Sequence, residues 1–200
     1  MAENDPNKHE RTLFIISILY LMFLRVSELV ESDRWSPQMN HFYQDSYKNW
    51  WFKTVGKGNK ERSIAVNDDM IAALKRWRRH LGLTPALPSL NDTHPLIPKL
   101  RGKGNINDTK SIYLIVQLCF NTAADTLKQS KQDTEAENLL KASSHWLRHT
   151  GISDNINKFN RPIAHVRDDA GHASISTTDR YNDITLLERH RNERKNKLEH

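Results

Sequence analysis

The chain has 200 residues, which fits one ordinary domain, and 30 Lys and Arg residues against 24 Asp and Glu residues leave a net charge of +6. Its single cysteine, Cys119, excludes an internal disulfide and a four-thiolate zinc site, so a reducing compartment is expected. The apolar run at 13–24 would span roughly 18 Å as a helix, which is too short to cross a bilayer. We therefore expect this run to be a buried helix in a protein without a membrane span.

The first half of the chain predicts a helix, a β-hairpin and a second helix. The first helix is expected at 5–31 with an interruption near Arg25, followed by a turn-rich stretch at 35–49. Aromatic and β-branched residues at 50–55 and 62–66, separated by a loop with two glycines, predict the hairpin. Asn67 or Asp68 can cap the second helix, which should run to about Leu81 and end at Gly82.

The second half predicts a loop and then several helices. The loop at 83–110 holds four of the seven prolines, and apolar residues at helical spacing predict a helix at 111–127. The polar stretch at 125–141 is compatible with a helix or a mobile loop. Ser143 or Ser144 can cap a helix at 145–159, Pro162 suits the first position of a short helix that Gly171 ends, and a basic helix is expected at 185–197. The expected fold is mixed α/β, mainly α-helical, with a small antiparallel sheet.

Four polar clusters could carry chemistry, and each has an ordinary structural explanation. Arg25 could be a helix-end charge paired with a glutamate, and the loop lysines Lys57 and Lys60 could be solvated. Tyr181, which ends the cluster that begins at Gly171-His172, could be a packed surface aromatic. His145 and His149 stand one helical turn apart, but Trp146 occupies the position where a zinc protease has its glutamate. Taken together, two arginines, two histidines, a lysine and a tyrosine form a set that can cleave a phosphodiester without a metal ion.

These clusters resemble the motifs of the tyrosine recombinases, the phage-integrase family, in their catalytic domain. The spacings match as well, because His145 precedes Arg148 by three positions, His172 follows 24 positions later and Tyr181 nine positions after that. The matching segments are Leu24-Arg25-Val26-Ser27-Glu28-Leu29, Gly56-Lys57-Gly58-Asn59-Lys60-Glu61-Arg62, His145 to Thr150, and Gly171-His172 through Tyr181.

The resemblance implies a role for each motif residue. Tyr181 is the expected nucleophile, which attacks a DNA phosphorus and leaves a 3′-phosphotyrosyl bond and a free 5′-hydroxyl. Arg25 and Arg148 would hold the non-bridging oxygens. Lys57 would donate a proton to the leaving oxygen, and His145 would accept the proton of the phenol. His172 would donate a hydrogen bond to the phosphate, and Glu28 would support Arg25.

The resemblance also implies partners and boundaries. Residues 1–197 would be the catalytic domain, without the family's N-terminal core-binding domain, and 198–200 would be a vector-derived tag remnant. The expected partners are double-stranded DNA and further copies of the chain in a tetramer on DNA, with residues 184–197 exchanged between protomers. No cofactor, metal or membrane is expected, and the location would be the cytoplasm of a bacterium. Candidate contacts to the DNA backbone are Lys60, Arg62, Lys99, Arg101 and Lys103.

The sequence also departs from the family's pattern and leaves other functions open. Phe23 stands where the family often has glycine, Ser144 where it often has proline, and Ala170 where it usually has leucine. Two alternatives to a site-specific recombinase or integrase are an enzyme like the type IB topoisomerases or telomere resolvases, and a non-catalytic DNA-binding regulator with a vestigial site. The presence of all six motif residues favours an enzyme.

Overall fold

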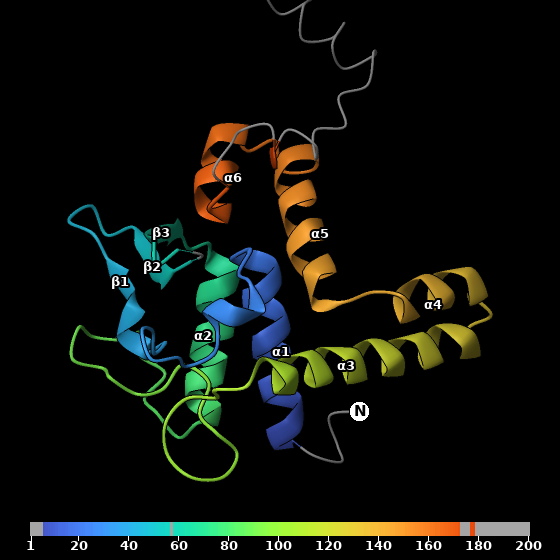
Figure 1. Cartoon of the computed structure of the whole chain (residues 1–200), viewed down its shortest axis with the longest axis horizontal. Coiled ribbons are helices and arrows are strands. Elements are labelled where there is room, and N and C mark those ends of the chain that lie inside the picture. The colour runs from blue at the N-terminus through green and yellow to red at the C-terminus, as the bar shows by residue number, and fades with distance from the viewer. Residues whose placement is uncertain (1–5, 57, 173–176, 179–200) are drawn as a thin grey trace, which may run out of the picture.

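The computed structural model describes residues 6–56, 58–172 and 177–178 (Figure 1). Lys57, Tyr181 and the expected C-terminal helix at 185–197 therefore lie outside the described residues. The described elements, in chain order, are α1 (Pro6–Leu21), η1 (Val26–Glu28), η2 (Met39–His41), β1 (Phe42–Gln44), β2 (Trp50–Val55), β3 (Glu61–Ala65), α2 (Asp68–His80), α3 (Thr109–Gln129), α4 (Asp133–Leu140), α5 (Ser144–Asn157) and α6 (Ile163–Ala170). The described part of the chain is mainly helical with one small sheet, which confirms the predicted fold class.

The sheet has three antiparallel strands in the order β1-β2-β3. The predicted hairpin is confirmed as β2 and β3, with β3 starting one residue earlier than expected. The turn-rich stretch at 35–49 also holds η2 and β1, which the sequence did not predict. Phe52 of β2 pairs with Phe42 on one side and with Ile64 on the other, and all three side chains are buried. These three residues fix the sheet against the core.

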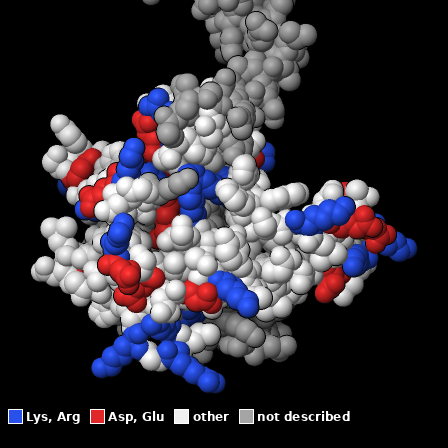
Figure 2. All heavy atoms as spheres, viewed as in Figure 1, with Lys and Arg blue, Asp and Glu red and all other residues white. Residues whose placement is uncertain are grey.

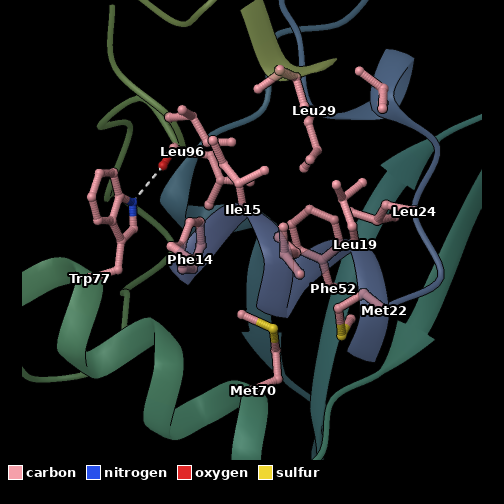
Figure 3. Close-up of a cluster of buried hydrophobic side chains, with 14 of the residues drawn as sticks. Phe14, Ile15, Leu19, Met22, Leu24, Leu29, Phe52, Met70, Trp77 and Leu96 are labelled. Carbon is pink, nitrogen blue, oxygen red and sulfur yellow. Dashed lines mark hydrogen bonds between the residues drawn. The ribbon is translucent and has the colours of Figure 1, made fainter. Parts of the chain in front are cut away.

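α1 lies at the centre of the main core, and the sheet, α2 and the 83–110 segment pack around it (Figure 3). The Trp77 ring of α2 stacks on Phe14 of α1 with 5.3 Å between ring centroids. The Trp77 indole also donates a 2.8 Å hydrogen bond to the Leu96 carbonyl, as Figure 3 shows. This hydrogen bond is one of the contacts that anchor the proline-rich segment to the core, where its side chains Leu96, Ile97 and Ile106 are also buried.

The first helix is shorter than the sequence suggested. α1 ends at Leu21 rather than being interrupted near Arg25, and only the short η1 turn follows before residue 31. Between them Phe23 takes a φ of 51°, in the left-handed region. Because an α-helix cannot continue through a left-handed residue, the chain turns there and places Arg25 just before η1.

The helices of the second half follow the predicted order. Asp108 caps α3, which is longer than expected at both ends, and the polar stretch that follows forms the helix α4. Ser143 precedes α5, while Pro162 lies one position before α6 rather than at its first position. Gly171 ends α6 with a φ of 63°, as its sequence position predicted. Within the described part of the chain, no helix is long and apolar enough to cross a membrane.

Candidate active site

Three of the six motif residues line one cleft of about 180 Å³. Arg25 comes from the segment before η1, whereas His145 and Arg148 come from α5, some 120 positions further along the chain. The spacing of three positions places His145 and Arg148 on the same face of α5, which the sequence predicted. The remaining lining residues are Leu24, Val26, Ser27, Thr109, Tyr113 and Ser144.

The Arg148 guanidinium is held by two backbone carbonyls inside the protein. The side chain is 3% exposed, and it donates to the Phe23 oxygen and, at 2.6 Å, to the Ala170 oxygen. These acceptors belong to the turn after α1 and the end of α6. A guanidinium carries five N–H groups, so two carbonyls can fix its position while its edge still faces the cleft.

Close contact between α5 and α1 brings Arg148 to this position. A Cβ atom at Gly151 would lie 2.1 Å from the Tyr20 oxygen and 3.1 Å from the Phe23 ring. Only glycine therefore lets the two helices approach this closely one turn after Arg148. Asp154 lies at the same interface, where it accepts a 2.6 Å hydrogen bond from the Tyr20 hydroxyl.

Arg25 is positioned through Glu28. Glu28 is 1% exposed, and its carboxylate accepts a 2.8 Å hydrogen bond from the Arg25 backbone and lies 3.4 Å from the Arg25 guanidinium. The Arg25 side chain itself is one-third exposed. Burial opposes ionisation of Glu28, but the hydrogen bonds and charges of Arg62 and Arg25 outweigh it, so the pKa of Glu28 is lowered. Glu28 thus contacts both the backbone N–H and the guanidinium of Arg25, and its supporting role in the reaction stays a prediction.

His172 adjoins the same group of charges. Burial first, and then the charges of Arg148, Arg25 and His149, lower the pKa of His172 to about 4. Its Nδ1 lies 2.9 Å from the hydroxyl of Thr178, which is fully buried. The structure therefore brings together Arg25, His145, Arg148 and His172, while Lys57 and Tyr181 lie outside the described residues.

Among the candidate contacts to the DNA backbone, Arg62 requires a correction. Its three guanidinium nitrogens all donate within the protein, with two bonds of 2.6 and 3.0 Å to Glu28 and one of 3.0 Å to the Asp169 carbonyl. Its side chain is 11% exposed. Arg62 is therefore an internal ion-pair partner rather than a residue of the DNA-facing set.

The other candidates remain at the surface. Lys60, Arg101 and Lys103 are exposed and Lys99 is half-buried. Residues 98–105 form a tight turn closed by a bridge between Pro98 and Asn105, so Arg101 and Lys103 project near its tip. Figure 2 shows that basic and acidic side chains are interspersed on the displayed face, which agrees with the modest net charge.

The sequence did not predict the contacts that Asp169 of α6 makes with β3 and with Arg161. Asp169, 6% exposed, accepts hydrogen bonds from the Ala65 backbone and from Arg161, and its carbonyl accepts one from Arg62. The only sequence signal for these contacts was the presence of charged residues next to motif residues, which is equally typical of a solvated surface.

Solved structures of recombinases share this fold. The XerH site-specific recombinase bound to palindromic difH substrate aligns with a TM-score of 0.61 at 20% identity, covering 96% of this chain and 47% of that one. The Tn1549 transposon integrase in complex with circular intermediate DNA aligns with a TM-score of 0.54 at 19% identity, covering 97% of this chain and 60% of that one.

Sequence relatives point to the same group. The tyrosine recombinase XerC of Staphylococcus saprophyticus is 28% identical over 189 residues, which are 92% of this chain and 53% of that protein. The XerC of Caldanaerobacter subterraneus is 26% identical over 178 residues, 88% of this chain and 42% of that protein. The chain thus spans about half the length of these relatives. The model of the phage integrase family matches residues 1–187, and this chain belongs to that family.

Proposed function

We propose that this chain is the catalytic domain of a site-specific tyrosine recombinase or integrase, which breaks and rejoins DNA strands through a 3′-phosphotyrosyl intermediate. The observation that carries the proposal is the convergence of Arg25, His145 and Arg148 on one cleft, with His172 beside them. Two guanidinium groups at one cleft suit a phosphate, whose negative charge they bind and whose oxygens they orient.

The proposed reaction exchanges one phosphate ester for another. The Tyr181 oxygen forms a bond to the scissile phosphorus while the bond from phosphorus to the 5′-oxygen breaks. The phenol gives its proton to His145, and Lys57 gives one to the leaving 5′-oxygen. Arg25 and Arg148 stabilise the negative charge that grows on the non-bridging oxygens in the transition state. The tyrosyl ester conserves the bond energy, so rejoining needs no nucleotide.

The environment of His172 suggests how it takes part. With a pKa of about 4 it is neutral at pH 7, so it can give the phosphate a hydrogen bond but not a full positive charge. The two arginines supply the permanent charge instead, because a guanidinium remains protonated at any physiological pH.

A DNA substrate with a nick near the scissile phosphate tests the proposal, because loss of the short leaving strand traps the covalent adduct. We expect the wild-type chain to form an adduct in the presence of a chelator and Tyr181→Phe to form none. Arg148→Gln should slow adduct formation by at least ~10²-fold, the scale of losing one transition-state charge contact. An adduct at another residue, or no adduct at any DNA concentration, would contradict the proposed function.

The proposed partners are duplex DNA and three further copies of the chain, acting in the bacterial cytoplasm. Lys60, Lys99, Arg101 and Lys103 are the proposed contacts to the DNA backbone. Residues 184–197, with an apolar edge at Ile184, Leu186 and Leu187, are proposed to pack on a neighbouring protomer. An apolar groove of about 580 Å³ between α1, α3 and α5, lined in part by Tyr20, Phe120 and Trp146, offers such a segment a surface. Truncation after Asp183 should therefore weaken assembly on DNA, and unchanged assembly would contradict the exchange.

A further inference from the structure

The buried ion pair between Arg62 and Glu28 touches three segments that carry motif residues. On one side Glu28 accepts the hydrogen bond from the Arg25 backbone. On a second side, a Cβ atom at Gly56 would lie 2.9 Å from Arg62 Nη1 and 3.1 Å from Glu28 Oε1. The ion pair therefore lies directly against the residue that precedes Lys57.

The third side of the ion pair is the end of α6. A Cβ atom at Gly171 would lie 3.0 to 3.2 Å from three atoms of the Arg62 guanidinium and its stem, so the arginine lies flat against the residue that precedes His172. Arg62 Nε also donates a 3.0 Å hydrogen bond to the Asp169 carbonyl. Ala170 lies between Asp169 and Gly171 in the chain, and its carbonyl oxygen accepts the hydrogen bond from Arg148.

Building on the proposed function, we infer that Arg62 is a positioning residue, which with Glu28 sets the relative positions of Arg25, Gly56 and His172. Among the residues that the structure describes, no backbone-to-backbone hydrogen bond joins these segments, which come from η1, the hairpin and α6. A bidentate guanidinium–carboxylate pair fixes both distance and orientation, whereas a lysine ammonium would supply the charge without the fork geometry. Glycine is then required at positions 56 and 171, because a Cβ atom at either position would crowd the ion pair.

Arg62→Lys tests this inference because it keeps the charge and removes the fork. At saturating DNA we expect adduct formation on the nicked substrate to slow by about 10-fold to 10²-fold, the scale of a small misplacement of reacting groups. DNA affinity and its salt dependence should stay unchanged, because the residue is internal. The opposite result is a variant that forms adduct at the wild-type rate but binds DNA more weakly, with the slope of log K against log salt reduced by about one. It would mean that Arg62 contacts a DNA phosphate, and it would overturn the inference.

Arg78→Lys is the matched control for simple loss of a buried ion pair. Arg78 is 3% exposed and pairs with Asp92 and the Ala86 carbonyl, and none of these three residues lines the cleft. The folded fraction of Arg78→Lys should form adduct at the wild-type rate. An equal slowing in both variants would show that lost stability, not positioning, explains the effect at Arg62, and would reject the inference.

A double-mutant cycle tests whether Arg62 and Glu28 act as one unit. Glu28→Gln keeps the size of the side chain and removes its charge. If both residues act through the same pair, Glu28→Gln combined with Arg62→Lys should be no slower than the slower single variant. If the rate reductions of the two single variants instead multiply in the double variant, Arg62 and Glu28 act independently, which would contradict the inference.

Hydrogen exchange without DNA separates this inference from the proposed function. In Arg62→Lys, amides at 24–29, 54–60 and 168–172 should all exchange faster than in wild type, while those of α2 and α3 should not change. Faster exchange confined to β3 would refute the coupling of the three segments. This readout decides the matter even if the wild-type chain forms no covalent adduct, a result that would reject only the proposed function.

Discussion

Phe23 combines an unfavourable backbone conformation with favourable packing. Its φ of 51° is left-handed, which costs a residue with a side chain about 1–2 kcal/mol. Its ring is fully buried with Ile152, Ile156 and Val166 of the second, smaller core. Loss of a buried phenylalanine ring costs about 3–5 kcal/mol, so packing outweighs the strain. This balance explains how phenylalanine can occupy a position where the family often has glycine.

The same balance predicts an unusual order of stabilities. Phe23→Gly should destabilise the protein less than Phe23→Ala, by about 1 kcal/mol, because both variants lose the ring and only glycine relieves the left-handed strain. Phe14, buried within α1, is the control, since there glycine should be worse than alanine by about 1 kcal/mol. Chemical denaturation of the four variants gives the free energies of unfolding, and the same order at both positions would contradict the account of Phe23.

At the scale of elements, the sequence predicted those whose signals are local. α2 has a capping side chain at Asn67, which accepts a hydrogen bond from the Met70 backbone, and a left-handed glycine, Gly82, just beyond its end. β1 lacks such signals, because three residues owe their strand conformation to pairing with β2 rather than to their own pattern. The end of α1 was misplaced because an unbroken apolar run gives no periodic signal for where a buried helix stops.

The packing of α5 on α1 leads to a prediction at Gly151. In an isolated helix, alanine would be favoured over glycine by about 1 kcal/mol. Here the added carbon would meet the Tyr20 carbonyl at 2.1 Å, and forcing helices apart typically costs about 1–3 kcal/mol. Gly151→Ala should therefore lower the melting temperature and slow adduct formation, because Arg148 would move away from the Phe23 carbonyl. Thr150→Ala, at an exposed position of the same helix, is the control, and a Gly151→Ala variant as stable as wild type would contradict the close approach.

At the scale of the whole molecule, the motifs predicted that residues far apart in the sequence would meet, but they did not predict what holds them together. Arg25 and Arg148 were expected to share a phosphate, and they line one cleft. The role of Arg62 could not be predicted, because its partners Glu28 and Asp169 are 34 and 107 positions away in the sequence. An arginine beside a lysine-rich loop has the same local pattern whether it faces DNA or an internal carboxylate.

The charge distribution predicts how binding to DNA should depend on salt. A net charge of +6 spread over interspersed charges gives little affinity by itself, so individual phosphate contacts should dominate. Arg101→Ala should reduce the slope of log K against log salt by about one, because one phosphate contact and its released counterion are lost. Arg76→Ala is the control: it removes the same charge, but Arg76 lies on α2 and is paired with Glu10. Titrations of a fluorescent duplex at several salt concentrations measure both slopes. If the two variants change the slope equally, net charge rather than the 98–105 turn governs binding, and Arg101 is not a phosphate contact.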